Sequence, residues 1–319
     1  MLNRRILRIK AFKVLYSYAE NPSMSLKEAQ AQLEMSCRAT RSLYLFMLAI
    51  IPALTEEARA RIDAARSKFN PTEEEKHPNL KFVENAIAPL LSDDPDFQKA
   101  VSREKLSWEQ YDVLLRNLYD SIRGKSYYSK YMASQERSLA EDVKLFIRIF
   151  EEEFVDNTDL EDILEDLSIY WNDDLAYALT CCCRTLDSFL AGERWSLPPL
   201  YQSEMAGREG MDSDKRFVTE LLRAAYCNYG TFYDKIAASV PKWDKDRLFV
   251  IDMVLIICGL AEAKAFPEIP VKVTINEYVD ISKYYSTPKS RSFVNGILDG
   301  IIQEMLASGE IVKSGRGLL

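Results

Sequence analysis

The sequence predicts an all-α protein, and three observations support that fold class. Apolar residues recur at spacings of three and four along most of the chain, the pattern of a helix with one buried face. Several of these runs begin with a Ser or Thr three residues before a Glu, the signature of a capping box. With 11 glycines, 12 prolines and no alternation of strand-like and helix-like segments in 319 residues, helix is the expected state.

The first helix is predicted over residues 4–19 and carries two apolar rows: Leu7, Ala11, Val14 and Tyr18 in one, and Ile9, Phe12 and Tyr16 in the other. A helix that is apolar on two sides is expected in the middle of a bundle. Its cations are Arg4, Arg5, Arg8, Lys10 and Lys13, and no acidic residue occurs among the first nineteen residues. Two interpretations stay open: solvated side chains with buried stems, or a patch that binds phosphates. The helix dipole makes cations unfavourable at a helix N-terminus. Their presence here therefore slightly favours the phosphate-binding interpretation.

Two helices are expected next. Ser25 and Glu28 form a capping box that opens a helix through about Met35. A separate, longer helix is expected over Arg38–Lys68, with a kink at Pro52 because proline removes a backbone donor.

Linkers and boundaries follow from proline and glycine. The segment Phe69–Asn79 reads as a linker in which Thr72 and Glu75 begin a short helical turn. The clearest boundary is Gly192–Asp212, with two adjacent prolines and three glycines. A buried helix is expected over Asp246–Lys264, and the basic tail Ile311–Leu319 is expected to fray.

The stretch 267–300 predicts two helices joined by an elbow. Pro270 precedes the first, and Thr274 with Glu277 forms its capping box. Thr287 is the expected N-cap of the second helix, with Pro288 at its first position.

Composition bounds the function. The net charge of −8 argues against a general polyanion binder, so any contact with nucleic acid needs a local basic patch. The six cysteines lack CxxC spacing and read as buried free thiols in a reducing cytosol, which predicts a cytoplasmic protein. The most apolar run, Leu248–Ala261, is shorter than the roughly 20 residues that span a bilayer, so no membrane partner is expected.

The sequence shows no evident group of catalytic or metal-binding residues. The single histidine, His77, lies in a polar linker, and the acidic segment 151–174 lacks the glycine of a calcium loop, so we expect no metal and no cofactor. The acidic segment is either a solvated helix face or a surface for a basic partner. Tyr127, Tyr128 and Tyr131 are interleaved with lysines and form either a helix–helix contact or a clamp for single-stranded RNA.

Two C-terminal blocks, residues 270–277 (PVKVTINE) and 292–299 (SFVNGILD), resemble the signature of the NusB family of bacterial transcription antitermination factors. The arginine-rich first helix, with Arg4, Arg5 and Arg8, is also similar to that of this family. The resemblance implies a helical bundle of two three-helix halves. Here a large helical insertion would enlarge the N-terminal half, giving N-terminal helices at 1–35, the insertion at 36–212 and a C-terminal bundle at 213–319.

The resemblance also implies a function. It implies binding of boxA-type RNA together with ribosomal protein NusE, within a transcribing RNA polymerase complex, so that ribosomal RNA operons are read through. Arg4, Arg5, Arg8, Lys10 and Lys13 would contact RNA, and Glu268 matches an acidic position of the partner surface. Asp252 matches a common acidic position of the family and is either a partner-binding residue or, as a buried acid, part of a structural hydrogen-bonded pair.

Two other classes of function compete with antitermination. An RNA-modifying enzyme needs a glycine-rich strand-to-helix turn and a catalytic cysteine in a strand, and the sequence offers neither, so we expect no enzyme. A helical protein–protein interaction scaffold without direct RNA binding is the remaining alternative.

Overall fold

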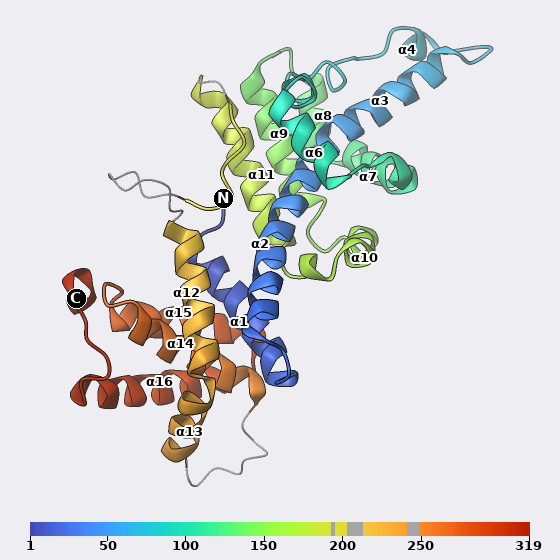
Figure 1. The fold of residues 1–319 in the computed structure, drawn as a ribbon. Helices are drawn as coiled ribbons and strands as arrows, with labels where there is room; N and C mark the ends of the chain where they lie inside the picture. The colour runs from blue at the N-terminus through green and yellow to red at the C-terminus, as the bar shows by residue number, and fades with distance from the viewer. Residues whose placement is uncertain (193–194, 203–212, 241–248) are drawn as a thin grey trace. The chain divides into compact units, whose positions relative to one another are not determined.

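The computed structural model describes residues 1–192, 195–202, 213–240 and 249–319, and the described residues form helices and loops without a strand. The all-α prediction is confirmed (Figure 1). The chain divides into two compact units. Unit 1 comprises Met1–Cys37 and Pro199–Leu319, and unit 2 comprises Arg38–Pro198. These divisions fall at 37/38 and 198/199, whereas the sequence suggested 35/36 and 212/213.

Unit 1 is built around helix α14 (Val250–Ala265), which is apolar on all sides and buried from Asp252 to Ala263. Its neighbours within the unit are the following helices (Figure 1): α1 (Arg4–Glu20), α12 (Ser213–Cys227), α13 (Tyr229–Ser239), α15 (Val271–Tyr285) and α16 (Ser290–Ala307). A helix that is apolar all round must be covered on every face, which explains this central position.

Gly259 allows α15 and α16 to pack closely against α14. A Cβ atom at this position would lie 2.8 Å from both Cδ atoms of Leu298 on α16 and 3.3 Å from Cδ2 of Tyr278 on α15. Only glycine leaves room for both side chains at their present distance, so α15 and α16 meet α14 at this point.

The predicted caps of the C-terminal helix pair are wrong. Helix α15 begins at Val271 directly after Pro270, and Thr274 lies inside it, buried, with its hydroxyl donating to Oε1 of Glu262 at 2.9 Å. Helix α16 begins at Ser290, three residues beyond Thr287. A tertiary partner therefore takes the Thr274 hydroxyl, whereas the Thr287 hydroxyl bonds locally to the Ser290 hydroxyl at 2.9 Å.

The C-terminal tail, expected to fray, packs against the loop between α14 and α15. The Ser314 amide donates to the Pro267 carbonyl at 3.1 Å, and Lys313 Nζ donates to the Phe266 carbonyl at 3.0 Å. Ile311 is buried. The order of the tail therefore comes from backbone contacts that its composition does not reveal.

Helix α2 (Leu26–Leu48) continues through the 37/38 division, so the separate helices expected up to Met35 and from Arg38 are one. Its N-terminus has the predicted capping box, with the Ser25 amide donating to Glu28 Oε2 at 2.7 Å. The helix breaks at Ala49, before α3 (Ile50–Arg66). Pro52 cannot donate to the Leu48 carbonyl, which accounts for the break at this place.

Unit 2 contains the C-terminal part of α2 and further helices: α3, α4 (Glu73–Lys76), α5 (Ile87–Ser92), α6 (Pro95–Glu104), α7 (Asp112–Gly124), α8 (Ser126–Ala133), α9 (Leu139–Glu152), α10 (Thr158–Leu167) and α11 (Leu175–Ser188). Its core includes Phe46, stacked on Trp108 at 4.0 Å and lying 5.7 Å from Trp171 between ring centroids. The predicted capping box of Thr72 and Glu75 is present at α4.

Most of the predicted boundary Gly192–Asp212, and residues 246–248 of the predicted helix Asp246–Lys264, lie outside the described residues. One helical segment, Leu26–Arg66, is long and apolar enough to cross a membrane by length and composition alone. Of its most apolar window, 61% is buried inside the fold, as in the core helices of many soluble proteins.

Candidate nucleic-acid and partner interface

The five cations of α1 separate into an outer and an inner set. The side chains of Arg4 and Arg5 are 44% and 48% exposed, and Lys13 is half-buried. Arg8 and Lys10 are only 4% and 1% exposed. The 3.6-residue period explains the division, because positions 5, 9, 13, 16 and 20 form the outward stripe of the helix. A side chain inside the fold cannot reach a phosphate, so the assignment of Arg8 and Lys10 to RNA is revised.

Arg8 belongs to a buried ion pair. Its Nε and Nη2 atoms donate to the two carboxylate oxygens of Glu262 on α14 at 2.7 and 2.8 Å. Glu262 also accepts from the hydroxyls of Thr274 and Tyr278, at 2.9 and 3.3 Å. Burial lowers the pKa of the Arg8 guanidinium, but the hydrogen bonds and charge of Glu262 outweigh it and raise that pKa overall. Arg8 therefore anchors α1 to the core of unit 1.

The outer cations also have acidic partners, which are half-buried for Arg5 and buried for Arg4. Arg5 donates through Nε to Glu277 at 2.9 Å and through Nη2 to Asp280 at 3.1 Å. The hydrogen bond to Glu277 is the main cause that raises the Arg5 pKa. Arg4 lies 3.5 Å from Asp214.

Aromatic rings border both sets of cations. The Arg4 guanidinium lies 5.0 Å from the centroid of the Phe217 ring, and Arg8 lies 5.3 Å from the same ring. Lys13 Nζ lies 5.5 Å from the centroid of Tyr285. Phe217 is only 3% exposed, so it packs against the arginines from inside the fold, while the half-buried Tyr285 beside Lys13 is the accessible ring.

The two predicted partner-binding acids differ in access. Glu268 is exposed on the loop between α14 and α15. Asp252 is 3% exposed, and its Oδ1 accepts from the Ser286 hydroxyl at 2.6 Å. The Ser290 hydroxyl lies within hydrogen-bond distance of both the Ser286 and the Thr287 hydroxyls, at 2.8 and 2.9 Å. Asp252 is therefore part of an internal network that fixes the turn between α15 and α16, and its assignment as a direct partner contact is revised.

The loop that carries Glu268 is held by the tail. Gly317 packs so closely on this loop that a Cβ atom would lie 1.9 Å from the Pro267 carbonyl oxygen. Together with the bonds from Lys313 and Ser314, this contact fixes the backbone on which Glu268 is presented.

Sequence reasoning missed Glu262 and the tail contacts. A signal for Glu262 was present, because an acid inside an almost wholly apolar helix needs a buried cation. The tail contacts left no such signal, since backbone groups make most of them.

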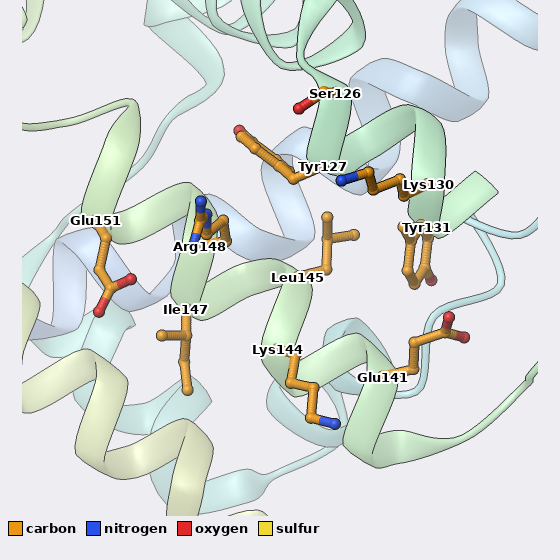
Figure 2. A pocket seen from close by; sticks show the side chains of 10 residues that line it. All are labelled: Ser126, Tyr127, Lys130, Tyr131, Glu141, Lys144, Leu145, Ile147, Arg148 and Glu151. Carbon is orange, nitrogen blue, oxygen red and sulfur yellow. The ribbon is translucent and has the colours of Figure 1, made fainter. Parts of the chain in front are cut away.

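Unit 2 has an open cavity of about 590 Å³ between α8 and α9. Figure 2 shows its lining side chains, with Tyr127 and Lys130 from α8 and Lys144 and Arg148 from α9. Its charges are mixed, because Glu141 and Glu151 also line it. A cavity with both signs of charge is a poor site for a polyanion.

The tyrosines near this cavity form internal contacts. Tyr128 and Tyr131 are buried, and the Tyr127 hydroxyl donates to Glu153 at 2.8 Å. These contacts match the helix–helix interpretation and offer no stacking platform for bases. Among the described residues, no group of His, Cys, Asp and Glu side chains is placed to hold a metal ion.

Comparison with known proteins gives a consistent match. The model of the NusB family matches residues 195–303. Three similar proteins each carry the name transcription antitermination protein NusB. The one from Chloroherpeton thalassium is 38% identical over 105 residues, 33% of this chain and 50% of its own length.

The matches to the other two relatives cover a larger share of those proteins. The protein from Salinibacter ruber is 34% identical over 107 residues, 34% of this chain and 67% of its own. That from Methylacidiphilum infernorum is 35% identical over 119 residues, 33% of this chain and 83% of its own. No solved structure matches the chain. The family match begins at residue 195, so α1 and nearly all of unit 2 lie outside it.

Proposed function

This chain belongs to the NusB family, and on that premise we propose that it is a transcription antitermination factor without catalytic activity. It binds boxA-type RNA together with ribosomal protein NusE, and the complex lets the transcribing RNA polymerase read through ribosomal RNA operons. The names of its relatives support the general role. RNA and partner binding rest on the surface of unit 1.

The exposed start of α1 carries the RNA proposal. The ion pairs of Arg5 with Glu277 and Asp280 lie at the surface, and such pairs contribute at most about 1 kcal/mol. A phosphate oxygen can therefore replace Glu277 or Asp280 at little cost, whereas Arg4, whose side chain is 44% exposed, would add a phosphate contact while it stays beside the buried Asp214. Arg8 cannot exchange its partner in this way, because separating a buried pair costs about 3–5 kcal/mol. The proposed RNA surface is thus Arg4, Arg5 and Lys13.

The loop before α15 supports the partner proposal. Glu268 is exposed there, on a backbone that the tail fixes in place. A rigid loop with an outward carboxylate suits recognition of a cationic group on NusE, because little ordering entropy is lost on binding.

The test measures binding of boxA-type RNA by fluorescence anisotropy from low to moderate salt, with and without NusE. Arg5→Ala should weaken binding and lower the salt slope by roughly 0.7, the value for one phosphate contact on a single strand. Arg116→Ala is the matched control, since Arg116 is an exposed arginine of unit 2 that also pairs with an acid, Asp112. Equal slopes for the two variants would contradict the proposed surface.

A protein–protein scaffold remains the second candidate. The pairing of both outer arginines with acids, and the net charge of −8, favour it. It predicts that NusE binds with the same affinity whether or not RNA is present and that RNA alone does not bind. Co-purification of NusE without any RNA shift in the anisotropy experiment would decide for the scaffold.

A further inference from the structure

Four tyrosines gather in unit 1, at the end of α1 opposite to the cations. They are Tyr18 of α1, Tyr226 in the last turn of α12, and Tyr229 and Tyr233 of α13. Ring centroids lie 4.5 Å apart for Tyr18 and Tyr226, and 5.2 Å apart for Tyr18 and Tyr229. Tyr229 and Tyr233 stack at 6.4 Å with an interplanar angle of 21°. We call these four residues the tyrosine surface.

The tyrosine surface is accessible. Tyr233 is 44% exposed, and Tyr18, Tyr226 and Tyr229 are each half-buried. The Tyr226 hydroxyl donates to the Met24 carbonyl at 2.8 Å, which holds its ring in place. Rigid, partly exposed tyrosines are typical anchors of protein interfaces, because they offer a large contact area at a low cost in side-chain entropy.

Two carboxylates lie near the surface. Glu20 closes α1 two residues after Tyr18. Burial raises the pKa of Tyr229 and of Tyr226, and the charges of Glu20 and Glu28, respectively, raise it further. Glu20 has no ion-pair partner in the part of the chain that the structure describes. Of the neighbouring cations on these helices, Arg223 pairs with Glu220 and Lys235 pairs with Glu310, while Lys27 is exposed.

We propose that the tyrosine surface, with Glu20 and Glu28, docks an arginine-bearing segment of a protein partner. A guanidinium group stacks on tyrosine faces and pairs with carboxylates at the same time. A nucleic-acid strand also stacks on tyrosines, but the carboxylates repel its phosphates.

The surface lies away from the two arginines of the proposed RNA surface, whereas Lys13 precedes Tyr18 by only about 7.5 Å along the helix axis. Arg4 and Glu20 are the first and last residues of α1, so they lie about 24 Å apart along the helix axis. That separation exceeds the Debye length of about 8 Å at physiological salt.

The test uses a labelled synthetic peptide of arginines alternating with glycines, and the full chain at physiological salt. Tyr233→Leu should weaken peptide binding roughly 3- to 30-fold, the range of one cation–π contact, whereas Tyr233→Phe keeps the ring and the affinity. Tyr284→Leu is the matched control, because Tyr284 is an 82% exposed tyrosine elsewhere in unit 1. Circular dichroism of each variant verifies that the fold is intact.

A second pair of variants separates the local site from general charge attraction. Glu20→Gln should weaken binding, while Glu74→Gln, which removes the same charge from an exposed position in unit 2, should not. A lysine–glycine peptide of equal charge should bind more weakly than the arginine peptide. No measurable peptide binding, equal effects of Tyr233→Leu and Tyr284→Leu, or binding of single-stranded RNA that Tyr233→Leu weakens would each overturn the proposal.

Discussion

The carboxylate of Glu262 organises the interior of unit 1. It accepts two hydrogen bonds from Arg8 and one each from Thr274 and Tyr278, so helices α1, α14 and α15 meet at a single charged group. Among the described residues, no buried side-chain nitrogen or oxygen lacks a hydrogen-bond partner. A buried network that is satisfied throughout fixes one arrangement of its helices.

This network leads to the first prediction at the residue scale. Arg8→Met should destabilise the protein by about 3–5 kcal/mol, because it leaves the buried carboxylate of Glu262 without its cation. The exposed pair gives the contrast: Arg5→Met should cost less than about 1 kcal/mol. Urea unfolding followed by circular dichroism measures both changes.

A double substitution tests the cause. Arg8→Met with Glu262→Gln removes both charges and leaves an amide oxygen for Thr274, so its cost should be about 1–3 kcal/mol below the sum of the single changes. Additive costs, or a cost of Arg8→Met similar to that of Arg5→Met, would mean that the pair does not anchor α1.

Individual residues also show where sequence reasoning reached its limit. The cations of α1 were found from the sequence, but their division into outer and inner sets was not, because Arg8 and Lys10 carry the same charge as Arg5. Whether a cation is buried depends on its ion-pair partner, and the partner of Arg8 lies 254 positions away in the sequence. The partner of Asp252 is likewise distant in sequence, since Ser286 lies 34 positions away in the turn between α15 and α16.

At the scale of elements, local signals predicted helix starts where no tertiary partner competed. The boxes at Ser25 and Thr72 are exposed and are present as predicted. Thr274 has the same pattern, but its hydroxyl is buried against Glu262 and the helix begins earlier. The stop expected after Met35 is absent because no proline or glycine interrupts α2 there.

The tail gives the prediction at this scale. Gly317→Ala should release the tail from the loop, because the added methyl group has no room beside the Pro267 carbonyl. Hydrogen exchange should then speed up at Ser314 and Gly317, whose amides are hydrogen-bonded in the native tail. Gly300→Ala in α16 is the control, since open space surrounds Gly300 and alanine favours a helix by about 1 kcal/mol. Unchanged exchange in Gly317→Ala would show that the tail is not held at this point.

At the scale of the molecule, each unit has its own core. The aromatic centre of unit 2 joins Phe46, Trp108 and Trp171, and its buried Lys81 is paired within the unit with Glu141 at 2.6 Å. The segment 36–212 was predicted to be helical, and its described residues form helices and loops. Its core was not predicted, because the sequence pattern does not show which helices face one another.

We therefore expect the fragment Arg38–Pro198 to fold when it is produced alone. Its circular dichroism spectrum should be that of a helical protein. Its thermal unfolding should be a single cooperative transition, as for most single domains of this size. A broad, non-cooperative melt would show that this unit depends on the rest of the chain.

The distance in sequence between Arg8 and Glu262 has a consequence for synthesis. At bacterial translation speeds, the 254 residues between them take roughly 13–50 s to make. All of Arg38–Pro198 is synthesised in that interval. While that segment is made, the acidic partners of the first helix do not yet exist. The nascent chain thus displays Arg8 without its partner beside the ribosome, a surface of RNA, until Glu262 has been made.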